Sequence, residues 1–410
     1  MPPRRVRGGL PEPVGPGSVT CRPLSVAGSC GGNPEEWVTG SRRCRMLRCD
    51  GALDGEVVIR SFFRHETFQG PSPVFPPGPV LPVLPFDAPA PVLAAIEGAG
   101  RTEDLRFSPD NRLLAIAAHV RNVVLLLRVR VEGGPSTPSV SIEDFAELTS
   151  KTFGGLHGVD WLDSATLVTG NRDGRVAVVR VPERLGGQTH AVEPLSVMKA
   201  GKLRSNLFAR PHSPGSLVVT TAANGQPALL VCNNYKDRVT QHFLDAAGGF
   251  RPTRHRVAIN RGLNLPDGIA ASADGRWVVV ASHLRHEVNV YDAAAGLTWR
   301  TPPVARLRGT QYPHGLRFGP GGRLFVVDAG SPYLFWYDGG APWSGVHQPS
   351  GRVRVMDNET FESERPNLRE GGAKGIDLDS TGAVLAITCH QVPLRLFAVN
   401  ELLQSAESVV

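Results

Sequence analysis

The sequence contains no uninterrupted apolar run of 18 residues, so it offers no candidate membrane-spanning helix. Its basic N-terminus lacks the apolar core of a secretory signal peptide. The formal net charge is +6, but the arginines are scattered and form no basic stripe with interleaved aromatic residues, which argues against a nucleic-acid-binding surface. These absences predict a cytoplasmic, bacterial-type protein that acts on a small molecule and binds neither membrane nor nucleic acid, in an oligomeric state that the sequence leaves open.

Cysteine is also scarce, with six in 410 residues, and no serine stands in a G-x-S-x-G elbow. Four cysteines lie in the first fifty residues at C-x8-C and C-x4-C spacings, which match no zinc site and predict unpaired thiols. These are Cys21, Cys30, Cys44 and Cys49. No nucleophile motif surrounds Cys232 or Cys389, although the neighbouring His390 leaves a reactive thiol at Cys389 as a secondary hypothesis.

Glycine and proline are abundant instead, with 46 and 35 residues, and together with 41% hydrophobic residues they predict many short strands joined by turns. Residues 1–88 are rich in both and are predicted to form a largely irregular or disordered extension. Only EVVIRSFF (56–63) reads as a strand there, and Met46 is a possible alternative start. The segment ends in PSPVFPPGPVLPVLPFDAPAP, which is typical of an extended linker.

From about residue 100 the chain repeats one pattern six times. Each copy has a polar residue, usually followed by glycine, then an alternating strand, a turn and a more apolar strand. The copies are TEDLRFSPDNRLLAIAAH (102–119), LHGVDWLDSATLVTGN (156–171), RSNLFARPHSPGSLVVTTA (204–222), LPDGIAASADGRWVVVASH (265–283), PHGLRFGPGGRLFVVDAG (313–330) and AKGIDLDSTGAVLAITCH (373–390).

Such a period predicts an all-β, six-bladed β-propeller of four-stranded blades over residues 89–404, with a tail at 405–410. Since the last copy has only three strands before the chain ends, we expect PVLAAIEG (91–98) to supply its outer strand and close the ring. A sandwich of unrelated hairpins is the alternative, and six-fold repetition argues against it.

In a propeller the first strand of each blade lines the central channel, so its equivalent positions converge at one mouth. The first polar positions of the six copies are Glu103, His157, Asn206, Asp267, His314 and Lys374. The second strands run antiparallel and return to the same face. Their ends carry His119, Asn171, His283, Asp328 and His390.

Polar channel residues can simply solvate the axis or satisfy strand ends. A concentration of titratable groups in one concave site, with five of the twelve histidines, instead indicates a functional site. Carboxylate, amide and imidazole groups together have the character of metal ligands.

The sequence resembles the six-bladed propellers of the senescence-marker and gluconolactonase superfamily, with its lactonase, paraoxonase-like and strictosidine-synthase-like members. LPDGIAASADGRWVVVAS (265–282) and EDLRF (103–107) carry the resemblance, which covers residues 90–400 as a fold. It implies a divalent cation, often calcium, held by a Glu, two Asn and an Asp. Glu103, Asn206 and Asp267 match three of these positions, whereas His157 replaces the second Asn.

The histidine alters the expected metal, because calcium prefers oxygen ligands whereas imidazole suits zinc, iron or manganese. The leading hypothesis is a metal-dependent hydrolase of a small lactone or ester. Glu103, His157, Asn206 and Asp267 would hold the metal, His314 would act as general base, and Lys374 would stabilise the oxyanion. Asp267 is counted with the catalytic groups as well, and the second-strand residues would bind substrate.

Two alternatives stay open. The first is a non-catalytic propeller that binds a ligand or a protein on the same face. The second is a lyase, isomerase or cyclase that uses the same acid–base ring without a metal. The density of histidine and carboxylate favours chemistry over an interaction surface, which would be richer in Tyr, Trp and Arg anchors.

Overall fold

The computed structural model describes residues 75–199, 209–222, 225–339, 342–363, 365, 369–390 and 392–407. The predictions made for residues 1–74 lie outside this part. They comprise the strand at 56–63, the thiols of the first fifty residues and the alternative start at Met46.

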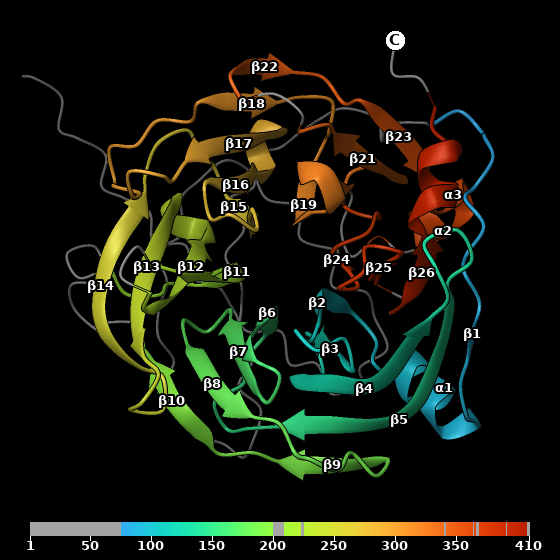
Figure 1. Cartoon of the computed structure of the whole chain (residues 1–410), viewed down its shortest axis with the longest axis horizontal. Helices are drawn as coiled ribbons and strands as arrows, with labels where there is room; N and C mark the ends of the chain where they lie inside the picture. The colour runs from blue at the N-terminus through green and yellow to red at the C-terminus, as the bar shows by residue number, and fades with distance from the viewer. Residues whose placement is uncertain are drawn as a thin grey trace, which may run out of the picture. The chain divides into compact units, whose positions relative to one another are not determined.

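The described chain forms six β-sheets arranged radially around a central channel, and the chain passes through them in order (Figure 1). The all-β, six-bladed propeller is therefore confirmed. The described residues contain three short α-helices, none long and apolar enough to cross a membrane. They are α1 (Ala90–Glu97), α2 (Asn358–Ser363) and α3 (Val399–Gln404).

The strands of the first three blades follow one another from the channel outward. Blade 1 has β2 (Thr102–Phe107), β3 (Leu113–Ala118), β4 (Val123–Glu132) and β5 (Ser139–Thr149). Blade 2 has β6 (Leu156–Asp163), β7 (Thr166–Asn171), β8 (Val176–Arg180) and β10 (Pro194–Met198), while β9 (Gln188–Ala191) reaches back to pair with β5. Blade 3 has β11 (Pro214–Thr221), β12 (Pro227–Asn233), β13 (Arg238–Asp245) and β14 (Arg251–Ile259).

The last three blades repeat this order. Blade 4 has β15 (Pro266–Ala271), β16 (Trp277–Ser282), β17 (Glu287–Asp292) and β18 (Ala305–Leu307), with β22 (Gly345–His347) added to its edge. Blade 5 has β19 (Pro313–Phe318), β20 (Leu324–Asp328), β21 (Tyr333–Tyr337) and β23 (Gly351–Arg354). Blade 6 has β24 (Ile376–Leu378), β25 (Val384–Ile387) and β26 (Arg395–Ala398).

Blade 3 differs from the sequence prediction, which began its first strand near residue 204 and made 216–222 the second. In the structure β11, which covers most of the predicted second strand, is the innermost strand, and β12 is the second. The reason is that β13 and β14 complete the sheet, and both were overlooked in the sequence.

Glycine after the ring position lets the inner strands of adjacent blades lie very close together. A Cβ on Gly268 would collide with the backbone carbonyl of His314, and a Cβ on Gly315 would collide with that of Lys374. The polar-residue–glycine pair seen in the sequence thus has a packing cause. It places the polar side chains of neighbouring blades beside one another at the mouth.

Buried carboxylates further along the inner strands link consecutive blades. Asp160 accepts a hydrogen bond from the backbone N–H of Val219 in blade 3 at 2.7 Å, and Asp377 accepts one from Phe107 at 2.7 Å, joining blade 6 to blade 1. Burial raises the pKa of Asp160 to about 6 and that of Asp377 to about 7, against the opposing effect of nearby Arg106.

Ring closure uses the proline-rich segment before α1 rather than residues 91–98. The N–H of Leu81 donates to the carbonyl of Arg354 in blade 5, and the N–H of Leu84 donates to Leu396 in blade 6. The short strand β1 (Phe86–Asp87) then pairs in parallel with β5 of blade 1. We call residues 81–87 the strap, because they connect three blades across the junction between the ends of the propeller.

The prediction that 91–98 forms the closing strand is wrong, because this segment is the helix α1. Alanine-rich sequence favours a helix, and Pro91 is tolerated in the first turn. Val92 and Ile96 are four residues apart, so one helical face buries both against blades 1 and 6.

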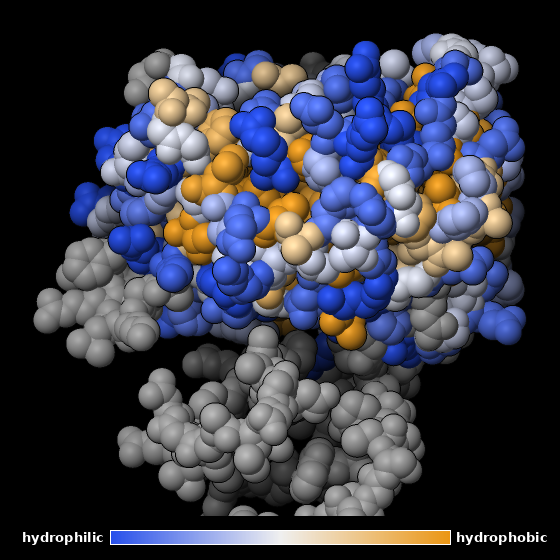
Figure 2. Space-filling view, turned by 90° about the horizontal axis from the view of Figure 1, so that it is seen from below, coloured by the Kyte–Doolittle hydropathy of each residue, from blue (hydrophilic) through white to orange (hydrophobic). Residues whose placement is uncertain are grey.

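The outer rim has a mixed surface. Figure 2 shows one edge of the propeller, where hydrophilic residues predominate and hydrophobic residues are visible between them. This mixture follows from the strand period of two, which turns alternate side chains of the outer strands toward solvent. In β5, for example, buried and more exposed positions alternate along much of the strand.

The strap gives a test of ring closure. Leu81 is 3% exposed and packs among core residues of blades 5 and 6, whereas Val83, two residues on, is 45% exposed. We expect Leu81→Ala to lower the free energy of unfolding by about 2–3 kcal/mol, because it removes buried methyl groups. Val83→Ala should change it by less than about 0.5 kcal/mol. Urea denaturation measures both, and equal effects would contradict the assigned closure.

Candidate functional site

The first ring of the mouth is assembled from the starts of the inner strands and is buried. Its five polar members are at most 4% exposed. They are Glu103, His157, Asp267, His314 and Lys374. At the equivalent position of blade 3 the register places Gly215, and Asn206, the residue predicted there, lies outside the described residues.

Asn234 occupies the space that Gly215 leaves. A Cβ at Gly215 would overlap the side-chain oxygens of both Asn234 and Asp267. Asn234 follows β12, and its Nδ2 donates a 2.8 Å hydrogen bond to Asp267 Oδ1, while its own Oδ1 is buried without a hydrogen-bond partner. Blade 3 therefore contributes an amide to the mouth, but from the end of its second strand.

Two imidazoles and two carboxylates form the centre of the mouth. His157 Nε2 lies 3.4 Å from Glu103 Oε2 and 3.6 Å from Asp267 Oδ1. His314 Nε2 lies 3.5 Å from Glu103 Oε2 and 3.4 Å from Asp267 Oδ2. The structure thus brings together three predicted ligands, Glu103, His157 and Asp267, and adds His314 to them.

Three atoms of this group have no hydrogen-bond partner although all are buried: Glu103 Oε2, His157 Nδ1 and His314 Nε2. His314 Nδ1 lies 2.9 Å from the carbonyl of Lys374, to which it donates its proton. Nε2 of the neutral ring is therefore an acceptor that faces the two carboxylates. Because His314 Nε2 and the carboxylate oxygens are all acceptors, they attract one another only if a proton or a cation lies between them.

A side chain of the protein, Arg172, competes with a cation for Nε2 of His157. This Nε2 lies 2.6 Å from a nitrogen of Arg172, which also lies 3.3 Å from Asp267 Oδ1. Arginine only donates, so Nε2 of His157 is an acceptor like that of His314. Burial, followed by Arg172, holds the pKa of His157 well below its usual range, and burial lowers the pKa of His314 to about 4. Both rings are neutral.

The carboxylates are ionised in spite of their burial. Burial alone would raise the pKa of Glu103, but Arg101 and Lys374 hold it well below its usual range. Arg101 Nε donates to Glu103 Oε1 at 2.5 Å. For Asp267, burial opposes the shift as well, and its pKa is lowered by the positive charge that the surrounding histidines carry when protonated and by that of Arg172.

A second group of charges lies beside the first. Glu370 pairs with Lys374 through one carboxylate oxygen, and its other oxygen is 3.0 Å from His283 Nε2. His283 Nδ1 also lies 3.3 Å from the carbonyl of Pro313, so both ring nitrogens face acceptors. Although burial opposes it, the contact with Glu370 raises the pKa of His283, which favours the imidazolium form.

Asn171 and Asp328, predicted to bind substrate, are fully buried and cap loops. Asn171 Oδ1 accepts the N–H of Gly154 at 3.1 Å, and Asp328 Oδ2 accepts that of Gln311 at 2.8 Å. In each case the donor stands two residues before the inner strand of the same blade. Their contacts are therefore structural, and in blade 2 the residue that follows the cap, Arg172, is the one that reaches the mouth.

His119 and His390 lie at the outer part of the mouth and are partly exposed. The His119 ring stands 6.1 Å from that of His157, and its Nδ1 donates to the carbonyl of Leu156 at 2.8 Å. Burial lowers the pKa of His119, which leaves its Nε2 as a neutral acceptor. Burial likewise lowers the pKa of His390, and the positive charge of Arg101 lowers it further.

The central group has the spacing of a metal site. Glu103, His157 and His314 offer ligand atoms within 4.8 Å of one another. N or O ligands at about 2.0–2.1 Å around a tetrahedral ion would lie about 3.3–3.4 Å apart. Glu103 Oε2 lies 3.4 Å from His157 Nε2 and 3.5 Å from His314 Nε2, close to that spacing, whereas Asp267 faces the two histidines through different oxygens and is not one of the three. The Nδ1–H of His314 also has the backbone acceptor that metal-bound histidines commonly have. The residues fit a cation, provided that Arg172 releases His157.

Sequence reasoning overlooked four charged or polar members of the site. They are Arg101, Arg172, Asn234 and Glu370. Arg172 and Asn234 each stand one residue beyond the second strand, as His119 and His283 do, so aligning the strand ends by that position would have found them. For Glu370 the one signal in the sequence is its position four residues before Lys374. For Arg101 it is the position two residues before Glu103.

No family model matches the chain, and no curated protein matches its sequence. Among solved structures it is similar to a luciferin-regenerating enzyme, at 11% identity and a TM-score of 0.48, over 76% of this chain and 95% of that chain. It is also similar to a functionally unknown protein from Desulfotomaculum acetoxidans, at 14% identity and a TM-score of 0.48, over 73% and 83% of the two chains. These likenesses carry no argument about activity, and membership of the gluconolactonase superfamily stays a prediction.

The Gly215 position tests how the mouth is filled. Gly215→Ala should lower the free energy of unfolding by roughly 1–3 kcal/mol, because the new Cβ overlaps Asn234 and Asp267. In an Asn234→Ala background the same change should cost less, since the nearest obstruction is gone. Gly134→Ala, whose Cβ would meet nothing within 4 Å, is the matched control. Strictly additive effects in denaturant titrations would contradict this packing.

Proposed function

We propose that the protein is a metal-dependent hydrolase that acts on a small lactone or ester at the mouth of the propeller channel. The observation that carries the proposal is the pair of buried, unpartnered acceptors, Glu103 Oε2 and His314 Nε2, which face one another with His157 and Asp267 beside them. A divalent cation is the partner that would satisfy all four groups at once.

In this proposal Glu103, His157, His314 and Asp267 hold the cation. Imidazole ligands favour zinc, iron or manganese over calcium. When bound, the cation would polarise the substrate carbonyl and lower the pKa of a water molecule. His314 was expected to be the general base, but its only free nitrogen faces the carboxylates, so we assign it as a ligand.

The general base is then His119. Its Nδ1 is bound to the carbonyl of Leu156, so its neutral Nε2 can accept a proton from the attacking water. Lys374 and Arg172 supply positive charge for the oxyanion that develops on the substrate carbonyl. Lys374 is held by Glu370 and lies 3.8 Å from Glu103 Oε2, which keeps its ammonium group next to the centre.

A second candidate is an acid–base lyase, isomerase or cyclase that needs no metal. The hydrogen bond from Arg172 to His157 favours it, because the guanidinium occupies the nitrogen that a cation would need. Positive charge also at least balances negative charge without a metal ion, since three carboxylates, Glu103, Asp267 and Glu370, face three cations besides the imidazolium that Glu370 favours at His283. These cations are Arg101, Arg172 and Lys374.

Metal content distinguishes the two candidates. Untagged protein purified without chelators should contain about one equivalent of a transition metal by elemental mass spectrometry, and His314→Ala should lose it because a ligand is removed. His347→Ala, at a histidine on the outer strand β22, is the matched control and should keep the metal. Wild-type protein that holds no metal, and gains none on addition of zinc, iron or manganese salts, would favour the metal-free candidate.

The assignment of the base has its own test, on whichever lactone or ester the wild type hydrolyses. His119→Ala should leave the metal content unchanged and lower kcat by about 100-fold, because general-base assistance is lost. His347→Ala, at a histidine of the outer strand β22, is the matched control and should leave kcat within a few-fold. Full turnover by His119→Ala would show that another group takes the proton.

A further inference from the structure

Three arginines share one buried carboxylate in the outer half of blade 4. Arg285 Nε lies 3.2 Å from Glu287 Oε1, and Arg308 Nη2 lies 2.9 Å from Glu287 Oε2. Arg306 Nε lies 3.9 Å from Glu287 Oε1. Glu287 is buried, whereas each of the three arginine side chains is between 45% and 48% exposed and can be reached from solvent. We call Arg285, Arg306 and Arg308 the arginine cluster.

The arginine cluster carries more positive charge than Glu287 can neutralise. Among the described residues, Glu287 is the one carboxylate within 4 Å of any of the three guanidinium groups. One carboxylate balances one of them, so two positive charges remain uncompensated. Arg306 in β18 and Arg308, which directly follows this strand, are two residues apart and extend from the same face. Like charges held this close repel one another, and an anion bound beside them removes the repulsion.

Strand register places the arginine cluster on the same face of the propeller as the mouth. Glu287 pairs with Ser282, the last residue of β16, and Ser282 pairs with Pro266, the first residue of β15. The residue after Pro266 is Asp267, which belongs to the centre of the mouth. β17 is the third strand from the channel (Figure 1). Since neighbouring strands are about 4.8 Å apart, Glu287 lies roughly 10 Å from Pro266 across the sheet.

The charge of the mouth also favours an anion once the cation of the proposed function is bound. The three carboxylates of the mouth are matched by Arg101, Arg172 and Lys374, so a divalent cation adds positive charge in excess of these pairs. The arginine cluster extends the positive potential outward along blade 4. A site surrounded by one sign of charge raises the local concentration of molecules of the opposite sign.

We propose that the substrate of the mouth is an anionic lactone or ester, and that its negatively charged group binds at the arginine cluster. This inference rests on the function proposed above and adds a class of substrate to it. A carboxylate or a phosphate suits the cluster, because guanidinium groups bind the oxygens of both in pairs. The separation of roughly 10 Å between Glu287 and Pro266 sets the distance between the anionic group and the reacting carbonyl.

Equilibrium binding tests the arginine cluster without relying on turnover. Suberate, a linear dicarboxylate long enough to span this distance, should bind the wild-type protein saturably in calorimetric titrations at constant ionic strength. Arg306→Gln should weaken the affinity at least about tenfold, because a charged donor is lost while Arg285 and Arg308 still neutralise Glu287. Arg180→Gln, at an exposed arginine of β8, is the matched control. No saturable binding by wild type, or an equal loss in Arg180→Gln, would overturn the proposal.

A second probe distinguishes a carboxylate from a phosphate at the arginine cluster. The compound ω-phosphono-octanoate has a chain of similar length with a phosphonate at one end. Tighter binding of this compound than of suberate assigns a phosphate-like group to the cluster, and tighter binding of suberate assigns a carboxylate. In both cases the affinity should depend on Arg306.

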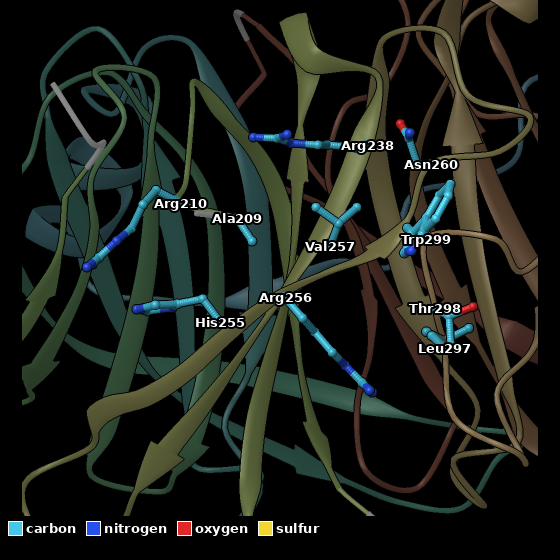
Figure 3. A pocket seen from close by; sticks show the side chains of 10 residues that line it. All are labelled: Ala209, Arg210, Arg238, His255, Arg256, Val257, Asn260, Leu297, Thr298 and Trp299. Carbon is cyan, nitrogen blue, oxygen red and sulfur yellow. The ribbon is translucent and has the colours of Figure 1, made fainter. Parts of the chain in front are cut away.

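Binding at other arginines must be separated from binding at the cluster. A cavity of about 800 Å³ at the outer part of blade 3 is lined by Arg210, Arg256 and Trp299 among others, and it shares no lining residue with the arginine cluster (Figure 3). Arg256→Gln should therefore leave the affinity for suberate within about twofold of wild type. Loss of suberate binding in Arg256→Gln, with retention in Arg306→Gln, would place the anion in that cavity and overturn the proposal.

Turnover tests the connection between the arginine cluster and the mouth. The mono-para-nitrophenyl ester of suberate has a free carboxylate, and the methyl ester of this compound has a similar length without the charge. Wild type should hydrolyse the charged compound with a kcat/KM at least about tenfold higher, and Arg306→Gln should remove this preference by raising KM for the charged compound alone. Arg306→Lys, which restores a positive charge, should recover part of it.

Equal kcat/KM for the two compounds in wild type, or a preference that persists in Arg306→Gln, would contradict the assigned substrate class. The two proposals fail in different ways. If suberate binds through Arg306 but neither ester is hydrolysed, the hydrolase proposal fails while the anion site stands. If both esters are hydrolysed equally well and suberate does not bind, the hydrolase proposal stands and the anion site fails.

Discussion

The close approach of the inner strands is the constraint on which the mouth depends. At Gly268 and Gly315 no side chain separates one blade from the next, so the polar residue before each glycine lies against the ring residue of the following blade. This contact brings Asp267, His314 and Lys374 from three blades into one buried group. Burial then strengthens every electrostatic interaction among them, because little water remains to screen the charges.

Such a group is stable only if its charges are compensated. The mouth holds three carboxylates that are buried or nearly so, and each has a cation at short range: Arg101 for Glu103, Arg172 for Asp267 and Lys374 for Glu370. Breaking one of these pairs would leave an uncompensated buried charge. The neutral rings of His157 and His314 add acceptors without adding charge, so the group can accommodate a cation once Arg172 releases Nε2 of His157.

Hydrogen bonds to backbone carbonyls orient two histidines of the mouth. His314 donates to the carbonyl of Lys374 and His119 to that of Leu156, which directs an acceptor nitrogen into the mouth in both cases. At blade 3 the Nδ1 atoms of His242 and His255 share a hydrogen bond of 2.7 Å, and His242 Nε2 lies 2.8 Å from Thr240 Oγ1.

The sequence by itself determined the six-fold repeat, the propeller and most of the first ring, because strand periodicity and the polar-residue–glycine pair are local patterns. It also placed His119 and His283 at the mouth, since each directly follows a second strand. That the 81–87 strap closes the ring is visible only in the tertiary structure. Ala90–Glu97, the segment predicted to close it, forms a helix instead, and the face of this helix that is buried is set by its packing against blades 1 and 6. Only the tertiary structure showed that Gly215 and Asn234, rather than Asn206, represent blade 3 at the mouth. Arg172 also contacts Asp267 of blade 4, and Glu370 also contacts His283 of blade 4; contacts between blades are set by packing that no local pattern encodes.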